Sequence, residues 1–354
     1  MKNNVKEEII NITKELMKYK TTNDNKNEFK KIFKYIKKLF PQDLFITEYE
    51  FNKNKSLVIS NTESKKLDLI FCTHIDIVPI NDYKIYEDEN YIKGRGSFDM
   101  KGSTAVCIEL FKTIKTNKKI ALFITSDEEM TGECAKRLLE IYSTNLAIVP
   151  DGGKNYQIIE EEKGQLQLKI SVKTKSAHAS QPYNGENAII KLNNIYNNLI
   201  AKYPLPKSED EYKTSINLSM IKGGEALNSV AENATMYIDI RHTKKDTKKS
   251  IIAYLKKIAP TATIEIIHEG SIFQTDINNL NIKKYIEISE KVINKKIEIV
   301  KTSATSDAIY FSDKNIPTIL TNPVGEFPHA PNEYVEKESL YNLYKIWKEF
   351  IEKY

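Results

Sequence analysis

Cysteine is rare in this sequence, and long apolar runs are absent. The three cysteines, Cys72, Cys107 and Cys134, lie far apart and form no Cys-x-x-Cys pair. This spacing argues against a disulfide framework and favours buried thiols in a reducing compartment. No apolar segment approaches the roughly 20 residues of a membrane helix, and the N-terminal segment has no apolar signal core. We therefore expect a cytoplasmic protein with no membrane partner.

Charge of one sign does not dominate either. The 53 basic and 48 acidic side chains are interspersed along the chain and leave a net charge of +5. This small excess suggests at most a weak preference for anionic ligands and does not indicate nucleic acid as a partner. Hydrophobic residues make up 40% of the 354 residues. The chain can therefore bury a sizeable core and is long enough for two domains.

Helical and strand patterns alternate in the first half of the chain. Repeated strand–helix units of this kind predict a mostly parallel sheet with helices on both faces, an α/β domain. The expected helices cover residues 5–19, 28–40, 103–113 and 133–142, and the expected strands cover 44–51, 56–60, 67–76, 120–125 and 146–149.

The pattern changes near Gly164. Apolar and polar residues alternate strictly from Leu166 to Val172, as is typical of a half-exposed antiparallel strand. The following elements are expected in the order β-α-β-β-α-β, which is typical of a ferredoxin-like α+β module. The α/β pattern resumes after Gln274. We therefore expect one α/β domain, residues 1–163 and 274–354, interrupted by a second domain, residues 164–273.

The apolar run from Leu67 ends abruptly in His74-Ile75-Asp76. A buried parallel strand fits such a run, and open α/β sheets place their ligand sites at the carboxyl ends of their strands. Asp76 could hold one imidazole nitrogen of His74 while the other nitrogen binds a metal ion. This triplet by itself is equally well explained by a structural histidine at the end of a strand.

Five residues with metal-binding side chains end predicted strands or lie in loops that contain glycine. Two histidines and three carboxylates are ligands suited to zinc, cobalt or manganese. A carboxylate that bridges two metal ions leaves two further ligands for each ion, and this set supplies that number. The candidate ligands are His74, Asp99, Glu129, Asp151 and His329.

Glu128 and Glu129 follow a buried strand directly, and the side chains of neighbouring residues diverge. One of them can therefore bind a metal ion while the other faces a bound water and exchanges a proton with it. In isolation, two solvated glutamates at a helix N-terminus would explain the pair better. Gly94-x-Gly96 suggests a dinucleotide site, but position 99 is aspartate instead of the third glycine that such a site requires.

Four motifs resemble one family, the two-zinc amidohydrolases and peptidases that include succinyl-diaminopimelate desuccinylase, acetylornithine deacetylase, aminoacylase and glutamate carboxypeptidase. The similarity extends over nearly the whole chain. The motifs are Thr73-His74-Ile75-Asp76, Gly94-Arg95-Gly96 with Asp99-Met100-Lys101-Gly102, Ser126-Asp127-Glu128-Glu129, and His329-Ala330-Pro331-Asn332-Glu333.

The resemblance implies two divalent metal ions, zinc first and cobalt or manganese as alternatives. It implies that His74 and Asp151 bind one ion, that Glu129 and His329 bind the other, and that Asp99 bridges them. It also implies that Glu128 is the general base and that Asp76 orients His74.

The inserted module is similar to the lid and dimerisation domain of that family, and this similarity implies a homodimer. His178, in Ser176-Ala177-His178-Ala179-Ser180, matches the histidine of the lid, while Asn228 and Arg241 match residues that bind substrate. Arginine presents a planar fork that suits a carboxylate. The sequence departs from the family twice. The fourth ligand segment reads Glu-Pro-Thr in many members, but here it is Val149-Pro150-Asp151-Gly152-Gly153, and Ala231 stands where a proline is usual.

The resemblance that these residues carry implies a hydrolase that cleaves the amide bond of a small N-acyl amino acid. Metal ions would lower the pKa of a water molecule, Glu128 would take its proton, and His178 would help to hold the tetrahedral oxyanion. A succinyl- or acetyl-type deacylase is the first expectation, and a dipeptidase or carboxypeptidase is the alternative. A non-catalytic binding protein of the same fold would have lost the base or a ligand, and neither is lost here.

Overall fold

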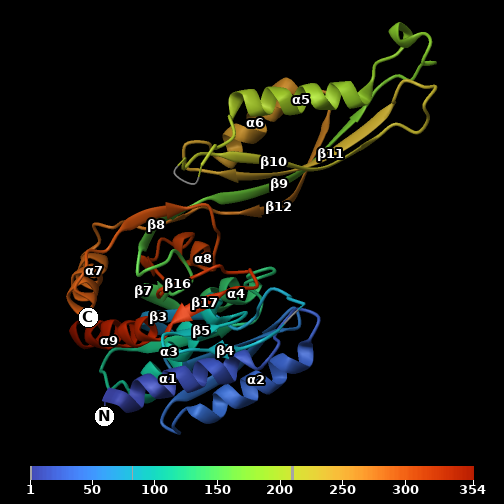
Figure 1. Ribbon diagram of the computed structural model, residues 1–354. Helices are drawn as coiled ribbons and strands as arrows, with labels where there is room; N and C mark the ends of the chain where they lie inside the picture. Colours follow the sequence, from blue (N-terminus) through green and yellow to red (C-terminus); the bar gives the residue numbers. More distant parts are fainter. Residues whose placement is uncertain (1, 82, 209–210) are drawn as a thin grey trace. The chain divides into compact units, whose positions relative to one another are not determined.

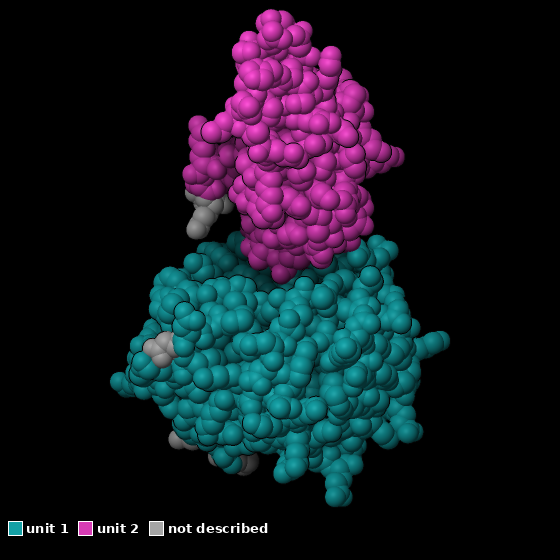
Figure 2. Space-filling model, turned by 90° about the vertical axis from the view of Figure 1, so that its right-hand side faces the viewer, with its two compact units in different colours: residues 1–160, 274–300, 306–354 teal, residues 161–273, 301–305 magenta. Residues whose placement is uncertain are grey.

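A computed structural model describes residues 2–81, 83–208 and 211–354. The chain forms two compact units, which are coloured separately in Figure 2. Unit 1 comprises Met1–Glu160, Gln274–Val300 and Ser306–Tyr354, and unit 2 comprises Glu161–Phe273 and Lys301–Thr305. Unit 2 is therefore mainly one insertion, Glu161–Phe273, in the chain of unit 1. The short segment Lys301–Thr305, later in the chain, also belongs to unit 2.

Unit 1 is built on a six-stranded sheet with the order β1-β2-β6-β3-β7-β15. Figure 1 labels β3 and β7 of this sheet. β3 pairs in parallel with β6 and β7, and β15 pairs in parallel with β7. β1 and β2 pair antiparallel with each other, and β2 pairs antiparallel with β6. The strands are β1 (Phe45–Phe51), β2 (Asn54–Ser60), β3 (Lys66–His74), β6 (Ile120–Thr125), β7 (Ser143–Val149) and β15 (Thr318–Leu320).

The sheet is thus mixed, which corrects the expectation of a mostly parallel sheet. The reason is the tight turn between β1 and β2, in which Phe51 pairs with Asn54. Asn52 and Lys53 form this turn with φ values of 49° and 68°. Two residues with positive φ connect neighbouring antiparallel strands, whereas a parallel pair needs a long crossover.

Helices cover both faces of the sheet. Leu69 and Phe71 of β3 belong to the same buried cluster as α1, α3 and α9, and the Phe71 ring lies 5.3 Å from that of Trp347 on α9. The intervening residues Ile70 and Cys72 are equally buried, and successive residues of a strand point to opposite faces. α4 packs against β1, β2 and β6. The helices of unit 1 are α1 (Lys2–Met17), α2 (Lys26–Leu39), α3 (Gly102–Thr113), α4 (Glu133–Ile141), α7 (Leu280–Ile293), α8 (Ala308–Ser312) and α9 (Lys337–Lys353).

The parallel strands β6, β3 and β7 are neighbours, so their carboxyl ends meet at one edge of the sheet. His74, the last residue of β3, pairs with Thr125, the last residue of β6. β7 ends two residues before Asp151. Two further segments carry candidate ligands: the short turn Ser97–Lys101 before α3, and the loop between β16 (Gly325–Glu326) and β17 (Tyr334–Glu336). β16 and β17 belong to a small sheet with the order β16-β17-β5-β4. It includes the short strands β5 (Tyr91–Lys93) and β4 (Tyr86–Glu87).

Unit 2 follows the order β-α-β-β-α-β that the sequence predicts. Its antiparallel sheet has the order β10-β11-β9-β12. Alternate residues of β9, from Leu166 to Val172, are buried in a second core beneath α5 and α6. Asn187 and Thr247 cap the two helices through their side chains. The elements are β9 (Gly164–Lys173), α5 (Ala188–Lys202), β10 (Ser215–Gly223), β11 (Asn233–His242), α6 (Lys248–Ile258) and β12 (Thr263–Gly270).

A three-stranded sheet, β13-β8-β14, contains β13 (Phe273–Gln274), β8 (Ile158–Glu162) and β14 (Ile299–Thr302).

Two further features bear on the expectations for cysteine chemistry and location. The three cysteines are free and buried. Within residues 2–81, 83–208 and 211–354, none of the helices combines the length and the apolar character that a membrane span needs.

Candidate functional site

His74 is almost fully buried where β3 ends. Its Nδ1 atom lies 3.2 Å from the backbone carbonyl oxygen of Asp76 and 3.4 Å from the Asp76 carboxylate. The other carboxylate oxygen of Asp76 accepts the backbone N–H of Glu129 at 2.9 Å. Asp76 therefore contacts the ring of one candidate ligand and the backbone of another. This arrangement directs His74 Nε2 away from Asp76 and toward the remaining acidic groups.

The Asp99 carboxylate lies between the two candidate histidine ligands. Its Oδ1 atom lies 3.1 Å from His74 Nε2, and its Oδ2 atom lies 3.0 Å from His329 Nε2. Asp99 comes from the turn before α3, and the two histidines come from segments more than 250 residues apart in the chain. The two oxygens of one carboxylate thus face two different imidazoles.

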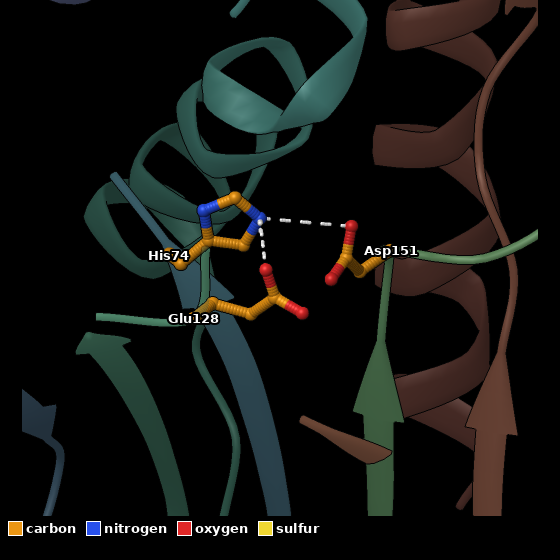
Figure 3. Close-up of side chains that lie close together, drawn as sticks. All are labelled: His74, Glu128 and Asp151. Atoms are coloured by element: carbon orange, nitrogen blue, oxygen red, sulfur yellow. Dashed lines mark ion pairs between the residues drawn. The ribbon is translucent and has the colours of Figure 1, made fainter. Parts of the chain in front are cut away.

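Two groups of three side chains converge around this carboxylate. The first group contains His74, Glu128 and Asp151, whose ligand atoms all lie within 4.8 Å of one another. In Figure 3, Glu128 and Asp151 approach the same ring nitrogen of His74 from different sides. The distances from His74 Nε2 are 3.7 Å to Asp151 Oδ1 and 3.9 Å to Glu128 Oε2. All three side chains lie at the carboxyl edge of the parallel strands.

The second group contains Asp99, Glu129 and His329. His329 Nε2 lies 3.0 Å from Glu129 Oε1, the same distance as from Asp99. The His329 side chain is 51% exposed, whereas Glu129 is largely buried. His329 has a φ of 63°, in the left-handed region that residues other than glycine rarely occupy. Backbone strain of this kind persists where the surrounding structure holds it, often at functional sites.

Burial and mutual repulsion shift the pKa values of these groups. Burial raises the pKa of Glu128 well above its ordinary range, and the nearby Asp151 carboxylate raises it further. Burial also raises the pKa of Asp151 to about 6. Hydrogen bonds to Asp99 and Glu129 raise the pKa of His329 to about 10. The centre thus concentrates acidic groups whose charged forms a bound cation would stabilise.

The orientation of His74 tests whether these residues suit a metal ion. Its buried Nε2 atom has no hydrogen-bond partner among the residues that the structure describes. If Nδ1 donates its proton to the Asp76 carbonyl, the lone pair of Nε2 faces carboxylate oxygens, which carry no proton to donate when they are ionised. A divalent cation satisfies both the lone pair and the carboxylates. The donor set therefore fits a metal ion with nitrogen and oxygen ligands.

Some residues near this centre received no role from the sequence. Asp307, at the start of α8, is buried, and the Thr125 hydroxyl donates to it at 3.4 Å. Burial, together with the negative charge of Asp127, holds its pKa well above the ordinary range. Asp127 itself accepts the Cys134 backbone N–H and the Thr131 hydroxyl, and so holds the turn that follows Glu128 and Glu129. The segment around Asp307 is polar and has no periodic pattern, so no local feature of the sequence pointed to this residue.

His178, Asn228 and Arg241 belong to unit 2. His178 is exposed, forms an isolated β-bridge with Ser229, and its Nδ1 atom lies 2.8 Å from the Ser180 hydroxyl. Asn228 lies beside it, because the Asn228 carbonyl accepts the Ala179 backbone N–H.

Arg241, near the end of β11, is held in place by polar neighbours. Its Nε atom donates to Asp239 at 2.9 Å, and one terminal nitrogen donates to Thr305 at 3.3 Å. Asp239 also accepts the side-chain amides of Gln165 and Gln167. The Arg241 side chain is 33% exposed, so solvent reaches part of it.

Comparison with known proteins relates the chain to characterised hydrolases. Residues 70–353 match the profile of peptidase family M20/M25/M40. The succinyl-diaminopimelate desuccinylase of Sulfurimonas denitrificans is 26% identical over 327 residues, which cover 84% of this chain and 87% of that protein. The acetylornithine deacetylase of Proteus mirabilis is 26% identical over 320 residues, which cover 81% and 79% of the two chains.

Solved structures share the fold over almost the whole chain. An aminopeptidase of Bacillus cereus superimposes with a TM-score of 0.80 at 22% identity, and 98% of each chain is covered. A tripeptidase of Staphylococcus aureus superimposes with a TM-score of 0.79 at 21% identity, again with 98% of each chain covered. At these identities the similarity establishes the fold.

Proposed function

The chain belongs to peptidase family M20/M25/M40, and from this premise we propose that it removes a succinyl- or acetyl-type acyl group from a small N-acyl amino acid. Members of this family are metal-dependent, and the chain is an enzyme that hydrolyses amide bonds, as its motifs predict. The proposed substrate class rests on the desuccinylase and deacetylase among its relatives.

The observation that carries the proposal is the position of Asp99 between two histidines. Each Asp99 oxygen faces one imidazole, which supports a carboxylate that bridges two metal ions. We assign His74 and Asp151 to one ion and Glu129 and His329 to the other. Zinc suits this set of nitrogen and oxygen ligands, and cobalt and manganese are alternatives.

Glu128 is the proposed general base. When bound, the metal ions would acidify the attacking water and polarise the scissile carbonyl group. Glu128 accepts the proton of that water and returns it to the departing amine. Burial raises the pKa of Glu128, which makes it a stronger proton acceptor than an ordinary glutamate. Asp76 orients His74 through the contacts at Nδ1.

The residues of unit 2 are proposed to bind the substrate. Arg241, fixed by Asp239 and Thr305, presents its remaining N–H groups to a substrate carboxylate. His178 donates a hydrogen bond to the developing oxyanion, and Asn228 binds the substrate beside it.

The geometry of unit 2 supports a homodimer in which each site uses residues of both chains. Arg241 pairs with Gln165, whereas Asn233 pairs with Lys173, eight residues further along β9. Eight residues of strand span about 26 Å. The pairing continues outward to His178 and Ser229, away from Arg241. Arg241 and His178 of one chain are thus too far apart to contact the same small substrate.

An exposed apolar surface accompanies this separation. β10 is an edge strand, and its Met220 and Ile221 side chains are 49% and 48% exposed. Ile189 and Ile190, in the first turn of α5, are also exposed, and Ile189 lies close to Gly223 at the end of β10. An unpaired strand edge with adjacent apolar residues is a suitable surface for a two-fold dimer.

Metal analysis tests the proposed centre. After metal loading and removal of free metal, we expect close to two divalent ions per chain, about 3.5–4 Å apart. Elemental analysis measures the stoichiometry, and X-ray absorption measures the spacing. Saturation at one ion per chain, with His329 not a ligand, would contradict the two-metal centre.

Mixed dimers test the shared site. Glu128→Ala and His178→Ala should each be inactive alone, but refolded together in equal amounts they should recover about a quarter of wild-type activity per chain. Half of the dimers are then mixed, and each mixed dimer holds one intact site. Each variant refolded alone is the control, and mass spectrometry verifies subunit exchange. If exchanged dimers stay inactive, His178 does not act across the dimer.

A substrate panel tests the reaction itself. The metal-loaded enzyme is assayed against N-succinyl and N-acetyl amino acids and against dipeptides and tripeptides, and free amine release is measured. The proposal expects the highest kcat/KM on an N-acyl amino acid. Faster cleavage of peptides would favour the alternative, a dipeptidase or carboxypeptidase of the same family.

A further inference from the structure

Glu333 is a buried carboxylate that the proposed reaction does not use. It lies four residues after His329 in the loop before β17, and its side chain has 0% exposure. One of its oxygens accepts a hydrogen bond from Arg95 at 2.9 Å, and the Arg95 side chain is only 3% exposed. A buried ion pair is costly to form, so its stabilising effect alone is weak evidence of its purpose.

The second oxygen of Glu333 contacts the loop that carries Asp99. It accepts the backbone N–H groups of Phe98 and Asp99, at 3.0 Å and 3.1 Å. The Glu333 backbone carbonyl also accepts the N–H of Gly94 at 2.8 Å. Glu333, which lies in the same loop as His329, therefore holds the Asp99 loop at two places. One is near the start of that loop, through Arg95, and the other is at Asp99 itself.

Both loops need such support because neither has regular backbone geometry at its candidate ligand. Asp99 has φ −118° and ψ 96°, and Met100 has φ −132° and ψ 34°, so both depart from helical values inside the turn Ser97–Lys101. His329 has a φ of 63°. Metal ligands on irregular loops depend on outer contacts for their orientation.

We propose that Glu333 is a positioning residue that sets the Asp99 carboxylate between His74 and His329. This inference rests on the ligand roles proposed above. Glu333 does not touch the reacting groups. It fixes the Asp99 backbone and, through its own chain segment, the loop of His329. The ion held by Asp99, Glu129 and His329 therefore depends on Glu333 more than the ion held by His74 and Asp151.

Cobalt binding is the readout, because the visible spectrum of Co²⁺ reports coordination geometry without an activity assay. In Glu333→Ala we expect the ion held by Asp99, Glu129 and His329 to bind about 10–100-fold less tightly, the usual effect of removing an outer contact of a metal ligand. Glu333→Asp keeps the charge but shortens the reach and should show the same kind of loss, which preserves the test if Glu333→Ala does not fold. Glu333→Gln keeps an oxygen for the two backbone N–H groups but loses the acceptor for Arg95, so it should lose less affinity than Glu333→Ala.

A matched control separates positioning from general stabilisation. Glu109, on α3, is another largely buried carboxylate of unit 1, and it pairs with Lys112 at 2.8 Å. Glu109→Gln should reduce thermal stability while leaving both cobalt affinities and the spectrum unchanged. Wild-type affinities and spectrum in Glu333→Asp, or an equal loss in Glu109→Gln, would overturn the positioning role. Failure of the wild-type protein itself to bind a second ion would instead overturn the proposed two-metal centre.

Discussion

Glu128→Ala should retain two metal ions per chain and lose activity by about 10²–10⁴-fold in kcat, the range that general acid–base catalysis supplies. The reason is that the substitution removes the proton acceptor but none of the five proposed ligands. Steady-state kinetics and elemental analysis on the same preparation measure both quantities. KM should change much less than kcat, because Glu128 acts on the attacking water in the transition state.

Two further variants make this result specific. Glu129→Ala should lose metal as well as activity, because Glu129 is one of the five proposed ligands and lies 3.0 Å from His329. Glu133→Ala, a few residues along the same segment at the start of α4, should leave metal content and turnover close to wild type. Near-normal turnover in Glu128→Ala would show that the base and the ligand have been assigned incorrectly.

Asp99→Ala should have the most severe effect on metal binding. It removes the one carboxylate that faces both histidines, so we expect the affinity for both ions to fall and activity to drop by about 10³-fold or more. Calorimetric titration with Zn²⁺ measures the affinities. Loss of only one ion, with the other bound as in the wild type, would show that Asp99 does not bridge.

Asp88→Ala is the matched control for that experiment. Asp88 is a partly exposed aspartate that accepts backbone N–H groups from Asn90 and Tyr91, and it lies in the same unit but outside the ligand groups. Its replacement should leave metal binding unchanged. A similar loss of metal affinity in Asp88→Ala would indicate a general loss of folding in unit 1 instead of a specific loss of ligands.

Local sequence patterns were sufficient for most helices and strands. β6 occupies residues 120–125, as its apolar pattern predicts, and α4 occupies residues 133–141, where a helix over 133–142 is expected. The change to strict alternation at Leu166 marks β9, which is buried on one face only. Periodicity reports these features because it reflects which side of an element is buried, and that information lies within a few consecutive residues.

Long-range pairing was not readable in the same way. The sheet is mixed: β3, β6, β7 and β15 pair in parallel, but the turn at Asn52 and Lys53 makes β1 and β2 antiparallel. The role of Glu333 was equally hidden, since it depends on a contact with Phe98 and Asp99 more than 230 residues away in the chain. A buried hydrogen bond between such distant residues leaves no periodic pattern.

The sequence by itself determined the family, the hydrolysis of amide bonds and the order of elements in unit 2, because motifs and periodicity are properties of short segments. Only the tertiary structure decided how closely His74, Asp99 and His329 approach one another, and that Arg241 and His178 lie far apart along the pairing of β9 with β11. The physical reason is that distances between side chains depend on strand order and register, which are set by packing across the whole chain.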